Sequence, residues 1–166
     1  MDGLTIRPAT RSDRQNLRAA IVVLQEHERR LHPTRLPGEQ IADAYLDWML
    51  GEAAKSGTAL IAEADGAFAG FAAGWVVEDD AIAETEDSNR YGLVSDVCVL
   101  AAYRGQRIAS RLIEAIEAHL AHAGVSRIRI GALAANRAAR RSYERSGYAP
   151  YEVVYEKVVA STGGQR

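Results

Sequence analysis

The chain has 166 residues, of which 48% are hydrophobic and 25% charged, the composition of an ordinary soluble domain with one hydrophobic core. Its net charge of −2 gives no overall attraction to nucleic acid or to an anionic membrane surface. The single cysteine, Cys98, excludes an internal disulfide and a cysteine-based metal cluster, and we expect no metal. No apolar run approaches about 18 residues and no signal-peptide pattern opens the chain, so we expect a cytoplasmic protein.

The first third of the chain predicts one short strand and two helices. Leu4–Arg7 has the pattern of a strand, with Pro8 acceptable at its end. Apolar residues at helical spacing predict a helix that starts near Asp13 and ends before His32-Pro33, because proline disfavours helix in the residue before it. A second helix is expected from about Glu39 to Ala54.

A β-hairpin and an acidic loop are expected next. The strands 58–64 and 67–78 flank Asp65-Gly66, which is a strong hairpin turn. Gly70 and Gly74 in the return strand predict a bulge or a close backbone approach. The acidic segment from Glu78 to Arg90 is either a solvated connector or a rim that attracts a cationic substrate.

The stretch 94–112 predicts a buried strand, a polar turn and an amphipathic helix. The turn is Arg104-Gly105-Gln106-Arg107, and the helix that follows carries an apolar stripe beginning at Ile108. The first N–H groups of a helix have no intrahelical partner, and the helix dipole adds positive charge there. A short turn that directs several N–H groups at one point therefore suits phosphate oxygens.

The C-terminal part predicts a strand over 127–132, a helix over 136–146 capped by Gly147, and a final strand over 151–159. We expect one domain over residues 1–160, with residues 161–166 as a disordered tail. Cys98 falls in the predicted buried strand, where an inert thiol is expected.

Two segments resemble motifs of the GNAT superfamily of N-acetyltransferases. The first is the acyl-CoA loop, R/Q-x-x-G-x-G/A after a strand ending in V-x-x-x-Y, and the matching residues are Val99, Tyr103, Arg104 and Ala109. Arg107 stands where the family prefers glycine, which implies that the backbone at this residue need not take positive φ. The second motif is N-x-x-A-x-x-x-Y-x-x-x-G-F/Y, and the matching residues are Asn136, Ala139, Tyr143, Gly147 and Tyr148.

The resemblance implies an α/β fold and an acetyl-CoA site. The fold would be a single domain whose mixed, mostly antiparallel sheet has six to seven strands, splayed between the fourth and fifth and flanked by about four helices. Acetyl-CoA would lie in that split and bind the backbone of Val97, Cys98 and Val99. Its pyrophosphate would lie on the turn and helix start formed by Arg104, Gly105, Gln106, Arg107, Ile108, Ala109 and Ser110. Asn136 would hold the cofactor arm, and Tyr143 would protonate the departing thiolate.

No general base is evident from the sequence. Many family members carry an acid nine residues before the motif arginine, where this chain has Ser95, which can order a water but cannot take the proton. Asp96 would face the other side of a regular strand. The other candidates are Glu26, His27, Glu28 and Glu78, each of which could equally be a solvated or capping residue. We therefore expect no single carboxylate to be essential.

The function expected is transfer of an acetyl group from acetyl-CoA to a primary amine by direct attack. The alternative is a module that binds acyl-CoA without turnover. The acceptor could be a polyamine, an aminoglycoside-like amine, a protein amine or an amino acid, and the candidate contacts are Glu26, Glu28, His32, Glu78 and Ser95. A homodimer would follow family habit, and no nucleic-acid partner is expected.

Overall fold

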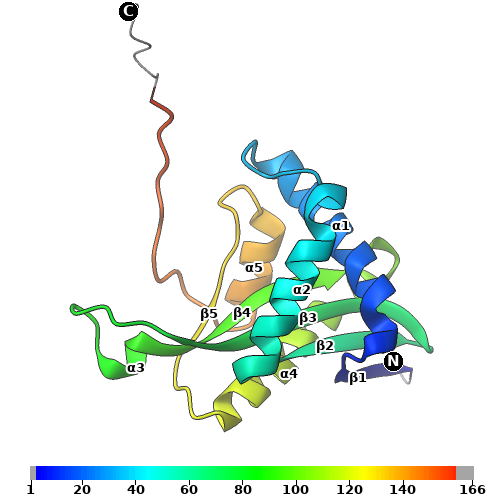
Figure 1. Ribbon diagram of the computed structural model, residues 1–166, viewed down its shortest axis with the longest axis horizontal. Coiled ribbons are helices and arrows are strands. Elements are labelled where there is room, and N and C mark those ends of the chain that lie inside the picture. Colours follow the sequence, from blue (N-terminus) through cyan, green and yellow to red (C-terminus); the bar gives the residue numbers. More distant parts are fainter. Residues whose placement is uncertain (1–2, 160–166) are drawn as a thin grey trace, which may run out of the picture.

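The computed structural model of the protein describes residues 3–159. Within these residues one sheet of five strands, in the order β1-β2-β3-β4-β5, is packed between helices (Figure 1). The strands are β1 (Leu4–Pro8), β2 (Gly57–Ala64), β3 (Ala67–Glu78), β4 (Arg90–Val99) and β5 (Ile128–Ile130). The helices are α1 (Arg14–Leu31), α2 (Gly38–Ser56), α3 (Glu86–Asn89), α4 (Ile108–His122) and α5 (Arg137–Arg145). Short 3-10 turns cover Arg11–Asp13 and Ala101–Tyr103.

The first half of the chain folds as its pattern predicts. Helix α1 ends at Leu31, two residues before Pro33. The β2–β3 turn has positive φ at both central residues, 50° at Asp65 and 78° at Gly66, which is the geometry that matches the twist of a hairpin. Each strand from β1 to β4 pairs antiparallel with the next strand along the chain, and only the β4–β5 pair is parallel.

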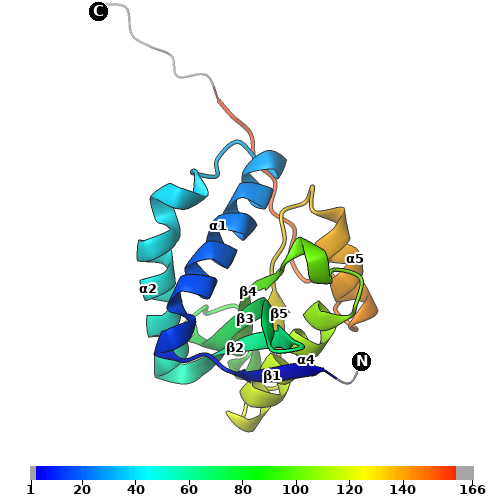
Figure 2. The same ribbon diagram turned by 90° about the vertical axis from the view of Figure 1, so that its right-hand side faces the viewer.

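The two faces of the sheet carry separate cores. Helices α1 and α2 lie side by side on one face, and α4 covers the other (Figure 2). Leu17, Leu46 and Phe71 belong to the first core, and Val94 and Leu112 belong to the second. No helix of residues 3–159 has both the length and the apolar character needed to cross a bilayer.

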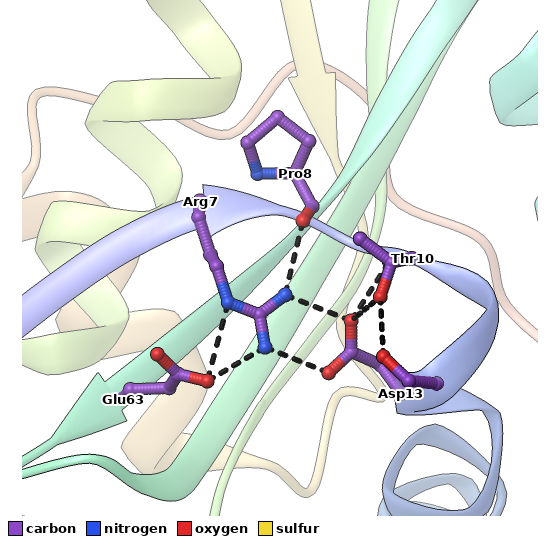
Figure 3. A network of polar contacts seen from close by, with 6 residues as sticks. Arg7, Pro8, Thr10, Asp13 and Glu63 are labelled. Atoms are coloured by element: carbon purple, nitrogen blue, oxygen red, sulfur yellow. Dashed lines mark hydrogen bonds and ion pairs between the residues drawn. The ribbon is translucent and has the colours of Figure 1, made fainter.

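An ion-pair network fixes β1 to its neighbours. The Arg7 guanidinium donates to both carboxylate oxygens of Asp13, at 2.8 Å each, and to Glu63 Oε1 at 2.6 Å (Figure 3). The Thr10 N–H also donates to Asp13, at 2.7 Å. Because Arg7 lies on β1, Glu63 on β2 and Asp13 at the start of α1, the network sets how the first helix leaves the sheet.

The sheet opens between β4 and β5. These strands pair only at Gly92–Ile128, Leu93–Arg129 and Val94–Ile130, and β5 ends there while β4 continues to Val99. The second half of β4 is therefore hydrogen-bonded to β3 on one side, and none of residues 3–159 forms a strand on its other side. This is the split that the family resemblance implies.

The expectation of six to seven strands is wrong, because the described residues form five. The predicted strand 151–159 is an extended, exposed segment instead. Its side chains touch the body at Tyr151, which lies over the Arg129 guanidinium, and at Glu156, which is 3.3 Å from His32. A strand needs a neighbouring edge of similar length, and β5 offers three residues. The expected tail 161–166 lies outside the described residues.

Candidate active site

The turn before α4 and the first turn of that helix leave backbone donors without protein partners. The first hydrogen bond inside α4 runs from Arg111 N–H to the Arg107 carbonyl, at 3.1 Å. No described residue accepts a hydrogen bond from a backbone N–H of residues 105–110. Because these donors meet at the positive end of a helix dipole, the turn can bind an anion such as a diphosphate.

Arg107 has the backbone conformation of the glycine that the family prefers at this position. Its φ of 61° and ψ of 15° lie in the left-handed region, although the arginine implied that the backbone need not take positive φ here. The chain has to reverse direction between Gly105, with φ 79°, and the helix that starts at Ile108. A side chain in this conformation costs about 1–2 kcal/mol, which explains why glycine suits the position.

Cys98 and its neighbours in β4 form one wall of the split. Val97, Cys98 and Val99 pair with residues 70–72 of β3. A Cβ on Gly70 would lie 2.3 Å from the Cys98 carbonyl oxygen, so this is the close backbone approach that the glycine predicts. The Cys98 thiol is buried, and burial raises its pKa to about 11. On the other side, the Arg104 guanidinium donates to the Val99 carbonyl at 3.1 Å.

Helix α5 places Asn136 and Tyr143. Asn136 is the N-cap, and its side-chain oxygen accepts from Ala139 N–H at 3.1 Å. Tyr143 is half-buried, and no described residue hydrogen-bonds to its hydroxyl. Burial first, and then the negative charges of Glu28 and Asp96, raises the pKa of Tyr143 to about 12. The phenol is therefore neutral at pH 7 and can act as a hydrogen-bond donor.

A cavity of about 360 Å³ lies between α1, α2, β4 and the chain that follows β5. Its walls are half apolar, and its polar groups include two carboxylates. The lining residues are Ile21, Leu24, Gln25, Glu28, Arg35, Ile41, Tyr45, Ser95, Asp96, Gly131, Ala132 and Leu133. A volume of this size suits a small molecule.

A bulge in β4 brings Ser95 and Asp96 into this cavity together. β3 pairs Ala73 with Asp96 and Gly74 with Val94, so Ser95 is an extra residue in the ladder. The side-chain directions show the same shift. Val94 and Val97 pack in the same core although they are three positions apart, a spacing that in a regular strand puts side chains on opposite faces. The expectation that Asp96 faces away is wrong, since it assumed a regular strand.

Asp96 is a buried carboxyl with two donors. Its oxygens accept from the Tyr45 hydroxyl at 2.9 and 3.2 Å, and from the Ser95 hydroxyl at 2.8 Å. Only 6% of the residue is exposed. Burial raises its pKa, and the two donors oppose that rise in part. Across the cavity, the Glu28 carboxylate pairs with Arg35 at 3.0 Å.

Of the five predicted acceptor contacts, the structure brings two to the cavity, Glu28 and Ser95. Glu26 accepts from Gly38 N–H at 2.7 Å and so caps α2. His32 lies in the α1–α2 loop beside Thr34, and Glu78 pairs with Arg90 at 3.2 Å, where a second cavity opens at the far end of β3. The three lie outside the lining of the first cavity.

Sequence reasoning missed several lining residues, chiefly Tyr45, Asp96 and the segment 131–133. A signal for Asp96 was present, because Gly74 predicts a bulge in β3 and the partner strand is β4. Within residues 3–159, no three His, Cys, Asp or Glu side chains are grouped as metal ligands would be.

Comparisons with known proteins agree with this architecture. The model of the acetyltransferase (GNAT) family matches residues 21–148. None of the curated protein sequences matches the chain.

Three solved structures have similar folds. The aminoglycoside N-acetyltransferase AAC(6')-Iy, in complex with the bisubstrate analogue CoA-S-monomethyl-acetylneamine, has a TM-score of 0.69 at 18% identity, covering 95% of this chain and 99% of that one. A GCN5-related N-acetyltransferase from Ralstonia eutropha JMP134 has a TM-score of 0.74 at 19% identity, covering 94% and 99%. A transcriptional regulator from Bacillus halodurans C-125 has a TM-score of 0.70 at 17% identity, with the same coverage. Similarity at these identities shows the fold alone.

Proposed function

This chain belongs to the GNAT acetyltransferase family, and on that premise we propose that it transfers an acetyl group from acetyl-CoA to a primary amine. The observation that carries the proposal is the split between β4 and β5, with an anion-binding turn at one end and a cavity beside it. A cytoplasmic location is part of the proposal.

The described residues fit acetyl-CoA. The unpartnered N–H groups of residues 105–110 would bind the diphosphate, with Arg104 and Arg107 beside it. The open edge of Val97, Cys98 and Val99 would bind the pantetheine arm as an added strand. For this to happen, Arg104 has to leave the Val99 carbonyl that it now covers. The Asn136 side-chain oxygen is used as a helix cap, so its amide nitrogen is the group left for the cofactor arm.

In the proposed reaction the amine nitrogen attacks the thioester carbonyl. A C–N bond forms, the C–S bond breaks, and the nitrogen loses one proton. Tyr143 donates its hydroxyl proton to the sulfur as negative charge develops there. Because its pKa is raised to about 12, the phenol is a weak acid. It can transfer its proton to the sulfur only as the C–S bond breaks and the sulfur becomes more basic.

The acceptor is proposed to be a small-molecule amine. The cavity of about 360 Å³ has the size of a small-molecule site, and its carboxyl groups, Asp96 and the Arg35-paired Glu28, can accept hydrogen bonds from an ammonium group. The test is a panel of polyamines, aminoglycosides, amino acids and lysine peptides at fixed acetyl-CoA, with free thiol as the readout. Turnover of a small amine supports the proposal, and turnover of the peptides alone contradicts this choice of acceptor.

An acyl-CoA sensor is the second candidate, and one structural neighbour is described as a transcriptional regulator. A sensor would bind coenzyme A, with heat in a calorimetric titration, and release no thiol with any amine. An enzyme would do both. The Tyr143 hydroxyl favours the enzyme, because it is accessible and none of residues 3–159 hydrogen-bonds to it, so it can contact a bound cofactor.

A homodimer is proposed from the segment 151–159. Six of its nine residues are valine or tyrosine, and each is between 62% and 92% exposed. No backbone N–H of the segment donates to a described residue. When two copies of the segment pair antiparallel with Val154 opposite Tyr155, Glu152 lies opposite Lys157 twice, so the strand is complementary to itself.

A further inference from the structure

We propose that Asp96, acting through the hydroxyl of Ser95, accepts the proton that the acceptor amine loses. The inference rests on the proposed acetyl transfer and names the group that the sequence left open. The sequence argument expected no essential carboxylate because Asp96 was placed on the far face of β4. The bulge at Ser95 removes that objection.

The geometry forms a two-step path from the cavity to the carboxylate. Ser95 and Asp96 both line the cavity, and the Ser95 Oγ donates to Asp96 Oδ2 at 2.8 Å. Asp96 is 6% exposed, so its carboxylate has little access to solvent of its own. The Ser95 oxygen keeps acceptor capacity for a second group, because a hydroxyl donates once and accepts twice.

The proton transfer balances without any further reactant. One N–H proton of the amine moves to Ser95 Oγ, while the Ser95 hydroxyl proton moves to Asp96 Oδ2. The net change is one proton from nitrogen to carboxylate, and Ser95 ends as it began. After the product leaves, solvent in the cavity takes the proton from Asp96 by the same path in reverse, and a solvent proton restores the Tyr143 phenol.

The surroundings of Asp96 favour its protonated form more than water does. Burial is the main cause that raises the pKa of Asp96, and the negative charge of Glu28 on α1 adds to it. Tyr45 on α2 and Ser95 donate to the carboxylate form and oppose the rise. The other charged or titratable groups near the site are Arg35, which is paired with Glu28, the Cys98 thiol and the Tyr143 phenol.

A structural role is the competing explanation, because the Tyr45–Asp96 hydrogen bonds also join α2 to β4. The two roles differ in the pH dependence of turnover. A proton acceptor makes kcat/KM fall below its pKa, and replacing Tyr45 by phenylalanine removes a donor that stabilises the carboxylate. In Tyr45→Phe the acidic limb should therefore move to higher pH. A structural link would lower activity at every pH without moving the limb.

The test uses the full chain with the best amine of the thiol-release panel and a second amine of different pKa. If the acidic limb of the pH profile reports a group of the protein, its position on the pH axis stays the same when the amine changes. Asp96→Asn should remove the acidic limb and lower kcat by about 100-fold or more, which is within the range of general base catalysis. Ser95→Ala should have a smaller effect, a loss of about 10-fold in kcat, because the carboxylate itself remains. Coenzyme A affinity should change less than twofold in both variants. Asp43→Asn, an exposed carboxylate of α2 that pairs with Arg18, is the matched control and should match the unmodified chain.

The inference would be overturned if the Asp96→Asn variant retained more than half of the unmodified kcat and still showed the acidic limb in its pH profile. If Asp96→Asn does not fold, the other two variants test the inference. An unchanged kcat in Ser95→Ala together with an unchanged position of the acidic limb in Tyr45→Phe would overturn the inference. If the unmodified chain binds coenzyme A but releases no thiol with any amine, the proposed function fails and this inference fails with it. Failure of the variants alone leaves the proposed function standing.

Discussion

The Arg7 guanidinium donates two hydrogen bonds of 2.8 Å to the Asp13 carboxylate, one to each oxygen. Asp13 is buried, with 5% of its surface exposed. The bidentate contact with Arg7, followed by hydrogen bonds from Thr10, holds the pKa of Asp13 well below its usual range. Such pairs are shorter and stronger than neutral hydrogen bonds.

Asp13→Asn should therefore lower the free energy of unfolding at pH 7 by about 2–3 kcal/mol, because a partly buried guanidinium loses one of its two carboxylate partners and keeps only Glu63. A carboxyl whose folded pKa is depressed stabilises the fold above its unfolded pKa of about 3.9 and loses that contribution as the pH falls further. Urea denaturation at pH 7 and pH 3 measures both effects. A difference between the two proteins that stays constant from pH 7 to pH 3 would contradict this account.

Arg107→Gly should stabilise the protein. The left-handed backbone at Arg107 costs about 1–2 kcal/mol, and the greater freedom of glycine in the unfolded chain cancels about 0.5–1 kcal/mol of the gain. A net gain of about 0.5 kcal/mol should raise Tm by about 1–2 °C in differential scanning calorimetry. Arg111→Gly, in the first turns of the same helix, is the control and should lower Tm. A lower Tm in both variants would show that the Arg107 side chain contributes more than its conformation costs.

Tyr143→Phe should lower kcat by about 10- to 100-fold, because it removes the donor proposed to protonate the sulfur. Coenzyme A affinity should be unchanged within a factor of two, since the diphosphate contacts lie on another element. Thiol release gives kcat, and calorimetry gives the affinity. Tyr155→Phe is the matched control, because Tyr155 is 92% exposed and lies outside the split and the cavity. Equal rates for the two variants would remove Tyr143 from the proposed role.

Two glycine substitutions should have opposite effects on stability. A Cβ at Gly74 would lie 2.7 Å from both Ile116 Cγ2 and the Leu93 carbonyl oxygen, so Gly74→Ala should cost about 1–3 kcal/mol through overpacking. Gly51, inside α2, has open space around it, and Gly51→Ala should gain about 0.8–1 kcal/mol from helix propensity. Urea denaturation separates the two. Because Gly74 lies opposite the β4 bulge, Gly74→Ala should also lower turnover, whereas Gly51→Ala should not.

The proposed dimer predicts a charge-reversal pattern. Lys157→Glu places two acids opposite each other in the paired segments and should shift the protein toward monomer in sedimentation velocity at low salt. The double exchange Glu152→Lys with Lys157→Glu restores opposite charges and should restore the dimer. A monomer for the unmodified chain at all concentrations, or a dimer that ignores both changes, would contradict the proposed pairing.

Local sequence patterns were sufficient for most elements of the fold. The hairpin at Asp65-Gly66, the end of α1 before Pro33 and the cap at Gly147 depend on the φ preference of one or two residues, which neighbouring residues in the chain already determine. The two motifs around Arg104 and Tyr143 identified the family, because their spacing is set within single turns and helices.

Tertiary structure alone decided three other features. The side of β4 that Asp96 faces depends on a register shift against β3, so no alternation within β4 could predict it. The left-handed backbone at Arg107 follows from where α4 must begin on the sheet. The segment 151–159 has the composition of a strand, but a strand forms only where an edge is present to pair with it, and β5 ends after three residues. The composition of a segment determines which secondary structure it prefers. Whether a strand pairs, and which side of the sheet a side chain faces, depend on residues that are distant along the chain.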